Sequence, residues 1–172
     1  MNVYYSLFEE KTDKASQHRL ALSLLDYALQ KDFGKSRGTF RYGEHGKPYF
    51  EDLDLFMNYS HCEYGVACAV GESEVGVDIC EVRKVRPAVI KRVCCDNELG
   101  TVRNDEDFIR VWVMKEAFAK FTGRGLSQGF ATVDTSAFPA GMVCRDGNVF
   151  VGCYCEVGGV VGDVRFVRVY FV

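Results

Sequence analysis

The order of helical and strand-like patterns along the chain is the feature that most constrains its fold. Apolar residues at helical spacing predict a helix from Asp13 or Ser16 to about Lys31, and a second long helix over residues 105–121. Strand patterns lie before, between and after these helices, over residues 2–8, 55–58, 64–70, 74–80, 149–157 and 164–172. The order strand–helix–strands, then helix–strands, predicts an α+β fold of two halves packed together and divided near residues 71–74.

Composition narrows the class of protein. Of the 172 residues, 48% are hydrophobic and 26% are charged, which is typical of a globular chain with a core of its own. The formal net charge of −3 argues against a general nucleic-acid binder, so an anion site must be made locally from a few cations. Residues 1–10 lack the pattern of a signal peptide, and no apolar run reaches the roughly 18 residues that span a bilayer. We therefore expect a cytoplasmic protein with no membrane or nucleic-acid partner.

The eight cysteines raise the alternative of a thiol-based redox or metal-storage protein. No CxxC motif occurs, and no two pairs of cysteines have the spacing of zinc ligands. Several cysteines lie within apolar runs, as Cys68 does in residues 66–70. We expect reduced cysteines that pack as small hydrophobic residues.

The strand predicted at residues 74–80 places an acid at an informative position. Alternate side chains of a strand share a face, so Val75, Val77 and Ile79 are expected in the core. Asp78 and Cys80 then point to the other face, where Gly76 leaves room for a bulky neighbour. This arrangement is typical of a metal ligand, although an exposed Asp on an edge strand would give the same pattern.

Two further segments carry polar groups beside apolar elements. Along the second long helix, Trp112, Glu116 and Lys120 are spaced by four residues and lie on one ridge, as an ordinary surface ion pair would also do. Lys47 stands between Gly46 and Pro48, and the segment 58–62 offers Ser60 and His61 just before an apolar strand. These cations and donors suit phosphate binding, and a turn with a solvated His is the alternative.

Together and in this order, the segments GKP, NxSH, VGVD, WxxKEAxxK and GRGLS resemble the 4'-phosphopantetheinyl transferase family. The resemblance extends from about His18 to Ser127 and is closest to the branch in which two similar α/β halves are fused as a pseudo-dimer. It implies an N-terminal half over residues 1–72, a C-terminal half over residues 73–172, and a monomer with one site. It also implies that coenzyme A and Mg²⁺ bind in the cleft between the halves.

The resemblance assigns roles residue by residue. Asp78 and Glu116 match the metal ligands, and magnesium prefers such hard oxygen ligands. Contacts with coenzyme A are implied for Arg19, Lys47, Ser60, His61 and Lys120, the histidine near the 3'-phosphate and Lys120 near the pyrophosphate. Many relatives carry a second acid where this chain has Cys80. A thiol is a poor magnesium ligand, so we expect water in that position, with Glu81 pointing away.

The reaction implied by the resemblance is phosphopantetheinyl transfer. A serine of an apo-acyl or peptidyl carrier protein attacks coenzyme A, and 3',5'-ADP leaves. Glu116 is the expected general base and Lys120 a second cation beside the metal. The basic residues Arg83, Lys84 and Arg86 are predicted to dock the acidic carrier. A non-catalytic carrier-binding module with the same fold is the alternative, prompted by Cys80.

Overall fold

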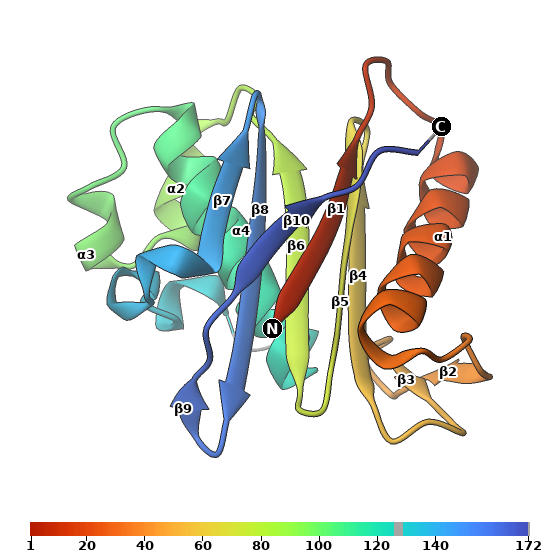
Figure 1. The fold of residues 1–172 in the computed structure, drawn as a ribbon. Coiled ribbons are helices and arrows are strands. Elements are labelled where there is room, and N and C mark those ends of the chain that lie inside the picture. The colour runs from red at the N-terminus through yellow and green to blue at the C-terminus, as the bar shows by residue number, and fades with distance from the viewer. Residues whose placement is uncertain (126–128, 172) are drawn as a thin grey trace.

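The computed structural model describes residues 1–125 and 129–171, and its main features are two β-sheets that each carry a long helix (Figure 1). The first part of the chain forms β1 (Asn2–Leu7), α1 (Lys14–Phe33), β2 (Phe40–Tyr42), β3 (Pro48–Phe50), β4 (Phe56–Cys62) and β5 (Gly65–Gly71). The helices of the second part are α2 (Pro87–Val93), α3 (Asp96–Leu99), α4 (Asp105–Thr122), η2 (Phe130–Thr132), η3 (Thr135–Ala137) and η4 (Ala140–Met142). Its strands are β6 (Val75–Glu81), β7 (Val143–Asp146), β8 (Val149–Val157), β9 (Val160–Val161) and β10 (Arg165–Arg168).

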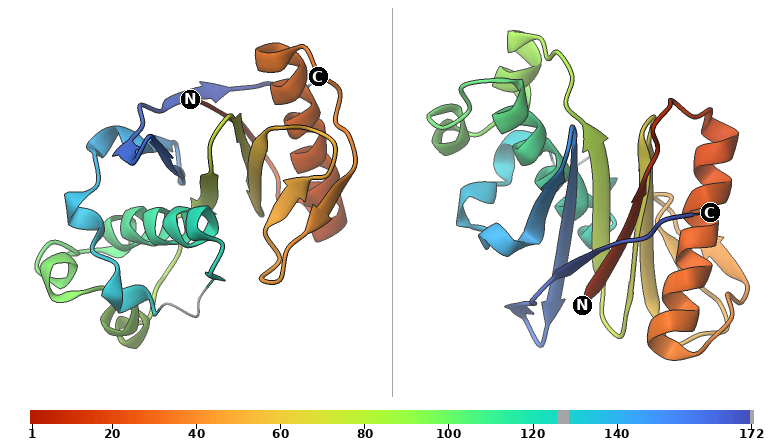
Figure 2. Two further views of the ribbon diagram at one scale, coloured as in Figure 1. Left: turned by 90° about the horizontal axis from the view of Figure 1, so that it is seen from below. Right: turned by 45° about the horizontal axis from the view of Figure 1, so that its top comes forward.

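The strands of the two parts are connected in the same way. The first sheet has the order β10-β1-β5-β4, and the second has the order β6-β8-β7, with β9 paired to β8. A strand, a long helix and an antiparallel pair of strands thus occur twice, as β1-α1-β4-β5 and β6-α4-β7-β8. β10 crosses back from the second part and pairs in parallel with β1 (Figure 2). The α+β class predicted from the sequence is confirmed.

Most of the predicted elements lie where the patterns placed them. The two long helices and the strands at 2–8, 64–70, 74–80 and 149–157 are confirmed within one to three residues. The predicted strand at 55–58 is the start of the longer β4, and the last strand covers only 165–168. The sequence analysis missed β2, β3, β7, β9, α3 and η2–η4, which are all four residues long or shorter.

The ends of α1 follow from local chemistry. Asp13, one of the two predicted caps, accepts hydrogen bonds from the backbone N–H groups of Ala15 and Ser16. Gly34 ends the helix with φ 63°, a left-handed conformation that glycine adopts without strain. These two signals set the ends of α1, and its apolar face is buried against the first sheet.

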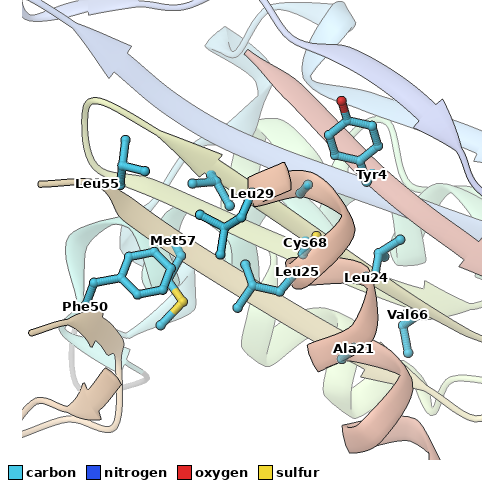
Figure 3. Packing of buried hydrophobic residues seen from close by; sticks show 12 residues of the cluster. Tyr4, Ala21, Leu24, Leu25, Leu29, Phe50, Leu55, Met57, Val66 and Cys68 are labelled. Atoms are coloured by element: carbon cyan, nitrogen blue, oxygen red, sulfur yellow. The ribbon is translucent and has the colours of Figure 1, made fainter. Parts of the chain in front are cut away.

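The core has separate clusters on the two faces of the sheets. Leu24, Leu25 and Leu29 of α1 pack with Met57 and Cys68 of the first sheet (Figure 3). A second cluster fills the space between the sheets and contains Val3, Tyr5, Ala67, Ala69, Val75, Val77, Ile79, Val149, Val151 and Cys153. The alternation predicted for β6 is therefore confirmed, because Val75, Val77 and Ile79 all belong to this cluster.

Gly76 sets the distance between β6 and α4. A Cβ atom at this position would lie 2.0 Å from the carbonyl oxygen of Ala117 and 2.3 Å from the amide nitrogen of Phe121. The helix backbone therefore packs directly on the strand at its glycine. This close approach brings the side chains of α4 beside Asp78, two residues further along β6.

The cysteines behave as expected of reduced residues. All eight are free in the structure, and five of them are buried, namely Cys68, Cys80, Cys94, Cys153 and Cys155.

Among the described residues, no helix is both long enough and apolar enough to cross a membrane.

Candidate functional site

The two sheets meet along β4 and β6, where side chains bridge the strands. The side-chain oxygen of Asn58 accepts a hydrogen bond from the backbone N–H of Val77, at 3.0 Å. Two residues further along β4, the Ser60 hydroxyl donates to Asp78 Oδ1 at 2.8 Å. All four residues are buried. Asn58 and Ser60 thus hold the seam between β4 and β6 together and orient the Asp78 carboxylate.

Lys120 completes a polar cluster at this seam. Its ammonium group lies 2.6 Å from Asp78 Oδ1, and it donates to Ser60 Oγ at 2.8 Å and to the carbonyl oxygen of Val77 at 3.1 Å. The structure therefore brings together three of the predicted site residues, Ser60, Asp78 and Lys120. The alternative, an ion pair between Glu116 and Lys120 on the surface, is not observed, because Lys120 is paired with Asp78.

Glu116 lies one helical turn before Lys120 on α4. Burial raises the pKa of its carboxyl to about 7, the negative charge of Asp78 adds to this effect, and the positive charge of Lys120 opposes it. Glu116 is thus a carboxyl group that exchanges a proton near neutral pH. Perturbation of this kind, by burial together with a specific charged neighbour, is typical of functional sites.

Two cavities meet at Glu116. The larger, which we call the large cleft, has a volume of about 1400 Å³ and contains Asp78, Glu116, Cys80, His61 and Trp112 in its lining. The smaller, which we call the small pocket, has a volume of about 280 Å³ and is lined by residues of β2–β4 and α4 that include Tyr42, Pro48, Tyr59, Glu116 and Lys120. Glu116 therefore lies where the two cavities adjoin.

The predicted phosphate-binding residues differ in their surroundings. Lys47 lines the small pocket, but its ammonium group is bound to Glu74 and to the carbonyl oxygen of Phe121, the latter at 2.7 Å. Lys47 therefore ties the GKP segment to the end of α4. Arg19 is exposed, bonds to Ser16 Oγ at 2.9 Å, and is not among the described residues that line either cavity.

His61 lies in the large cleft and is oriented by a residue that the sequence analysis missed. Its Nδ1 is 2.9 Å from Gln17 Oε1, and Gln17 in turn donates to the carbonyl oxygen of Thr12. Burial, and then the nearby charge of Lys120, lowers the pKa of His61, so the neutral imidazole is favoured at pH 7. The sequence does offer a signal for Gln17, because it is a polar residue on the apolar face of the predicted helix, where its side chain needs a hydrogen-bond partner.

Cys80 lies where the strand alternation predicted. It lines the large cleft with Asp78, and burial raises the pKa of its thiol to about 12. Glu81 also lines this cleft and is buried, and its Oε2 has no hydrogen-bond partner within residues 1–125 and 129–171. A protonated thiol therefore lies beside Asp78 in the lining of the cleft.

The predicted carrier-docking residues surround an apolar groove. Arg83, Lys84 and Arg86 follow β6 and are exposed. They line a cavity of about 280 Å³, which we call the basic groove, together with Val85, Val89, Phe108, Ile109 and Trp112. Arg83 and Trp112 also line the large cleft, so the two cavities share a wall.

Two further groups of residues bear on the site, the GRGLS segment after α4 and a cluster of possible metal ligands elsewhere in the fold. Of the GRGLS segment, Gly123 ends α4 with φ 68°, whereas Leu126 and Ser127 lie outside the described residues. Ligand atoms of Cys95, Glu98 and Asp134 lie within 4.8 Å of one another, but the Glu98 carboxylate is paired with Lys115 at 2.7 Å. This group is separate from the Asp78–Glu116 cleft.

Comparisons with known proteins agree with this geometry. Residues 74–153 match the family model of the 4'-phosphopantetheinyl transferase superfamily. The chain is 32% identical over 128 residues to a 4'-phosphopantetheinyl transferase of Bacillus subtilis, which is 66% of this chain and 56% of the relative. It is 30% identical over 125 residues to the 4'-phosphopantetheinyl transferase Sfp of Bacillus subtilis strain 168, with the same coverage of 66% and 56%. A putative 4'-phosphopantetheinyl transferase of Haemophilus influenzae is 31% identical over 150 residues, 76% of this chain and 61% of the relative.

The chain thus belongs to the 4'-phosphopantetheinyl transferase superfamily, as the resemblance of its motifs predicted. The matches span between 56% and 61% of the length of these three relatives.

Proposed function

We propose that this protein transfers 4'-phosphopantetheine from coenzyme A to a serine of an apo-acyl or peptidyl carrier protein and releases 3',5'-ADP. One observation carries the proposal. Asp78 and Glu116 come from distant parts of the chain and line one cleft, where Lys120 and Ser60 are hydrogen-bonded to the Asp78 carboxylate. Membership of the superfamily supports this reaction class.

Magnesium fits the residues at this position. Asp78 and Glu116 would hold the ion, because both offer the carboxylate oxygens that Mg²⁺ prefers, whereas the protonated Cys80 thiol would not. When bound, the ion supplies positive charge to the phosphate oxygens of coenzyme A. Lys47, His61 and Arg19 are the proposed further contacts with coenzyme A, and of these Lys47 and His61 line the two cavities.

In the proposed transfer one bond to phosphorus replaces another, and Glu116 and Lys120 assist this exchange. A new bond forms between the carrier serine oxygen and the phosphorus that bears pantetheine, and the bond from that phosphorus to the oxygen of 3',5'-ADP breaks. Glu116 accepts the serine proton directly or through a water molecule. Lys120 places a cation where negative charge increases in the transition state.

The first experiment tests Asp78 and Glu116 directly. The protein is incubated with coenzyme A, Mg²⁺ and an apo-carrier, and the carrier is weighed by mass spectrometry. We expect Asp78→Ala and Glu116→Gln each to lower turnover by about two orders of magnitude or more without unfolding the protein. Glu72→Gln, which changes an exposed acid on a turn, is the matched control. Near-normal rates in both site variants would refute the assigned roles.

The same incubation decides the alternative of a non-catalytic carrier-binding module. That module would bind the carrier and leave its mass unchanged at every Mg²⁺ concentration. Cys80 is the one residue that prompts this alternative, and Asp78, Glu116 and Lys120 all speak against it.

We also propose that the basic groove binds the carrier protein. Its cations suit an acidic partner, its apolar floor suits an apolar side chain, and Trp112 connects it to the large cleft. Arg83→Glu with Arg86→Glu should raise the carrier KM and leave the KM for coenzyme A unchanged. Lys31→Glu with Lys35→Glu reverses two exposed charges near the end of α1 and serves as the control. An unchanged carrier KM in the Arg83/Arg86 variant would contradict this docking surface.

The organisation of the chain is part of the proposal. The repeated connection of β1-α1-β4-β5 and β6-α4-β7-β8 supports two similar halves, over residues 1–72 and 73–172, fused as a pseudo-dimer. One chain would then hold a whole site and act as a cytoplasmic monomer. Sedimentation of the purified protein measures the oligomeric state.

A further inference from the structure

Lys115, the residue before Glu116, is a fully buried cation. Its side chain is 0% exposed, which is rare for lysine unless the charge is paired. The ammonium group lies 2.7 Å from Glu98 Oε2 and donates to the backbone carbonyl oxygens of Phe130, at 2.7 Å, and Val133, at 2.5 Å. These three contacts use all three N–H bonds of the ammonium group.

The partner carboxylate is equally engaged. Glu98 is 1% exposed, and its Oε2 also accepts a hydrogen bond from the backbone N–H of Cys95 at 2.9 Å. Its Oε1 accepts from the backbone N–H and the hydroxyl of Thr135, at 2.9 and 2.7 Å. The Lys115–Glu98 pair therefore joins α3 and the segment 130–135 to α4.

The segment that Lys115 holds reaches the wall of the site. The ring of Phe130 packs on the indole of Trp112, with ring centroids 5.1 Å apart. Trp112, like Arg83, lines both the large cleft and the basic groove. Lys115 fixes the backbone of Phe130, and Phe130 supports one side of Trp112.

We propose that the Lys115–Glu98 pair positions Trp112 through Phe130, and in this way sets the wall that the cleft shares with the basic groove. Lys115 is a positioning residue and touches no substrate. This role rests on the proposed function, since it concerns how the carrier reaches Glu116. Loss of the tether should affect the carrier more than coenzyme A, because Trp112 lines the basic groove and one wall of the large cleft, whereas the small pocket includes neither Phe130 nor Trp112 among its described lining residues.

Trp112 provides its own readout, because it is the single tryptophan of the chain. Its emission maximum and its quenching by acrylamide report the packing around the indole, whether or not the protein is active. We expect Lys115→Met to lower the Tm, since it leaves the Glu98 charge buried without its partner. The double variant Lys115→Met with Glu98→Gln removes both charges and should regain much of that loss.

The double variant separates positioning from stability. It still lacks the bonds from Lys115 to the carbonyl oxygens of Phe130 and Val133. We expect its Trp112 emission to shift to longer wavelength, its acrylamide quenching to increase, and its carrier KM to rise by roughly an order of magnitude, with a much smaller change in the coenzyme A KM. Phe130→Leu keeps the ion pair and removes the ring contact, so it should reproduce these changes without the loss of Tm shown by Lys115→Met.

Lys31→Met, at an exposed position, is the control and should change none of these values. If the folded double variant and Phe130→Leu both show the emission and quenching of the unchanged protein, the proposal is wrong and the pair only stabilises the fold. If the indole responds but the carrier KM does not, the link to the carrier step is refuted. A protein without transferase activity would refute the proposed function, and the fluorescence measurements would still decide whether Lys115 positions Trp112.

Discussion

Gly76→Ala is the substitution that most directly tests how the site is assembled. The added Cβ would lie 2.0 Å from the carbonyl oxygen of Ala117, more than 1 Å closer than a contact of about 3.5 Å. Ala117 and Phe121 meet the new atom with their backbones, which no change of rotamer can move. The helix must therefore shift away from β6 as a unit.

The second glycine that faces α4 supplies a matched comparison. On β8, a Cβ at Gly152 would lie 3.0 Å from the carbonyl oxygen of Val113, so relief needs a movement of only a few tenths of an ångström. Overpacking of a core costs about 1–3 kcal/mol, occasionally more. We expect Gly76→Ala to cost about 3 kcal/mol or more in the free energy of unfolding, and Gly152→Ala about 1 kcal/mol. The entropy that alanine removes from the unfolded chain is similar at both positions and cancels in the comparison.

Thermal and urea unfolding measure this difference. For a chain of this size, a gap of about 2 kcal/mol corresponds to a difference in Tm of about 4–8 °C. Because the shift separates Glu116 from Asp78, Gly76→Ala should also lower turnover by about a hundredfold under conditions where it is folded. If Gly76→Ala is as stable and as active as Gly152→Ala, close packing at Gly76 does not set the position of α4.

Two further predictions concern the groups around the cleft. In the metal-free protein, the pKa of the Glu116 carboxyl is about 7 in the folded chain, compared with an ordinary value of 4.5. The folded chain therefore binds this proton more tightly than the unfolded chain does. The free energy of unfolding should then decrease by at most about 3 kcal/mol as pH rises from 4.5 to 7, and Glu116→Gln should remove this slope in urea titrations. Cys80→Glu should leave turnover intact or lower the Mg²⁺ concentration needed for half-maximal activity, and complete inactivation would contradict water at that position.

The sequence predicted features that depend on short-range periodicity. Alternation along residues 74–80 placed Asp78 and Cys80 on one face because the period of a strand is fixed at two. The cap at Asp13 was predictable for a similar reason, since it depends on N–H groups two and three residues away. The identity of Asp78, Glu116 and Lys120 as candidates came from the order of the motifs.

Features that depend on contacts between distant segments were beyond the sequence. Nothing local to Lys47 indicates that Glu74 and the end of α4 neutralise it. The helical ridge of Glu116 and Lys120 suggested an ion pair between them, and only the fold shows that Asp78 competes for Lys120. Lys115 is a further case, because its neighbours in the sequence give no sign that α3 and residues 130–135 enclose it.

The seam between β4 and β6 explains why a polar site can lie inside this fold at all. β4 and β6 belong to different sheets, so the backbone groups that face the seam do not pair in a ladder there. Asn58 accepts from the N–H of Val77, and Lys120 donates to the carbonyl oxygen of the same residue, so side chains satisfy the groups that a ladder would have paired. A continuous ladder would have brought the two strands to about 4.8 Å and closed the seam. Because side chains bridge it instead, Asp78 keeps its position beside an open cleft, and two of the groups that join β4 to β6, Asp78 and Lys120, also line the cavities at Glu116.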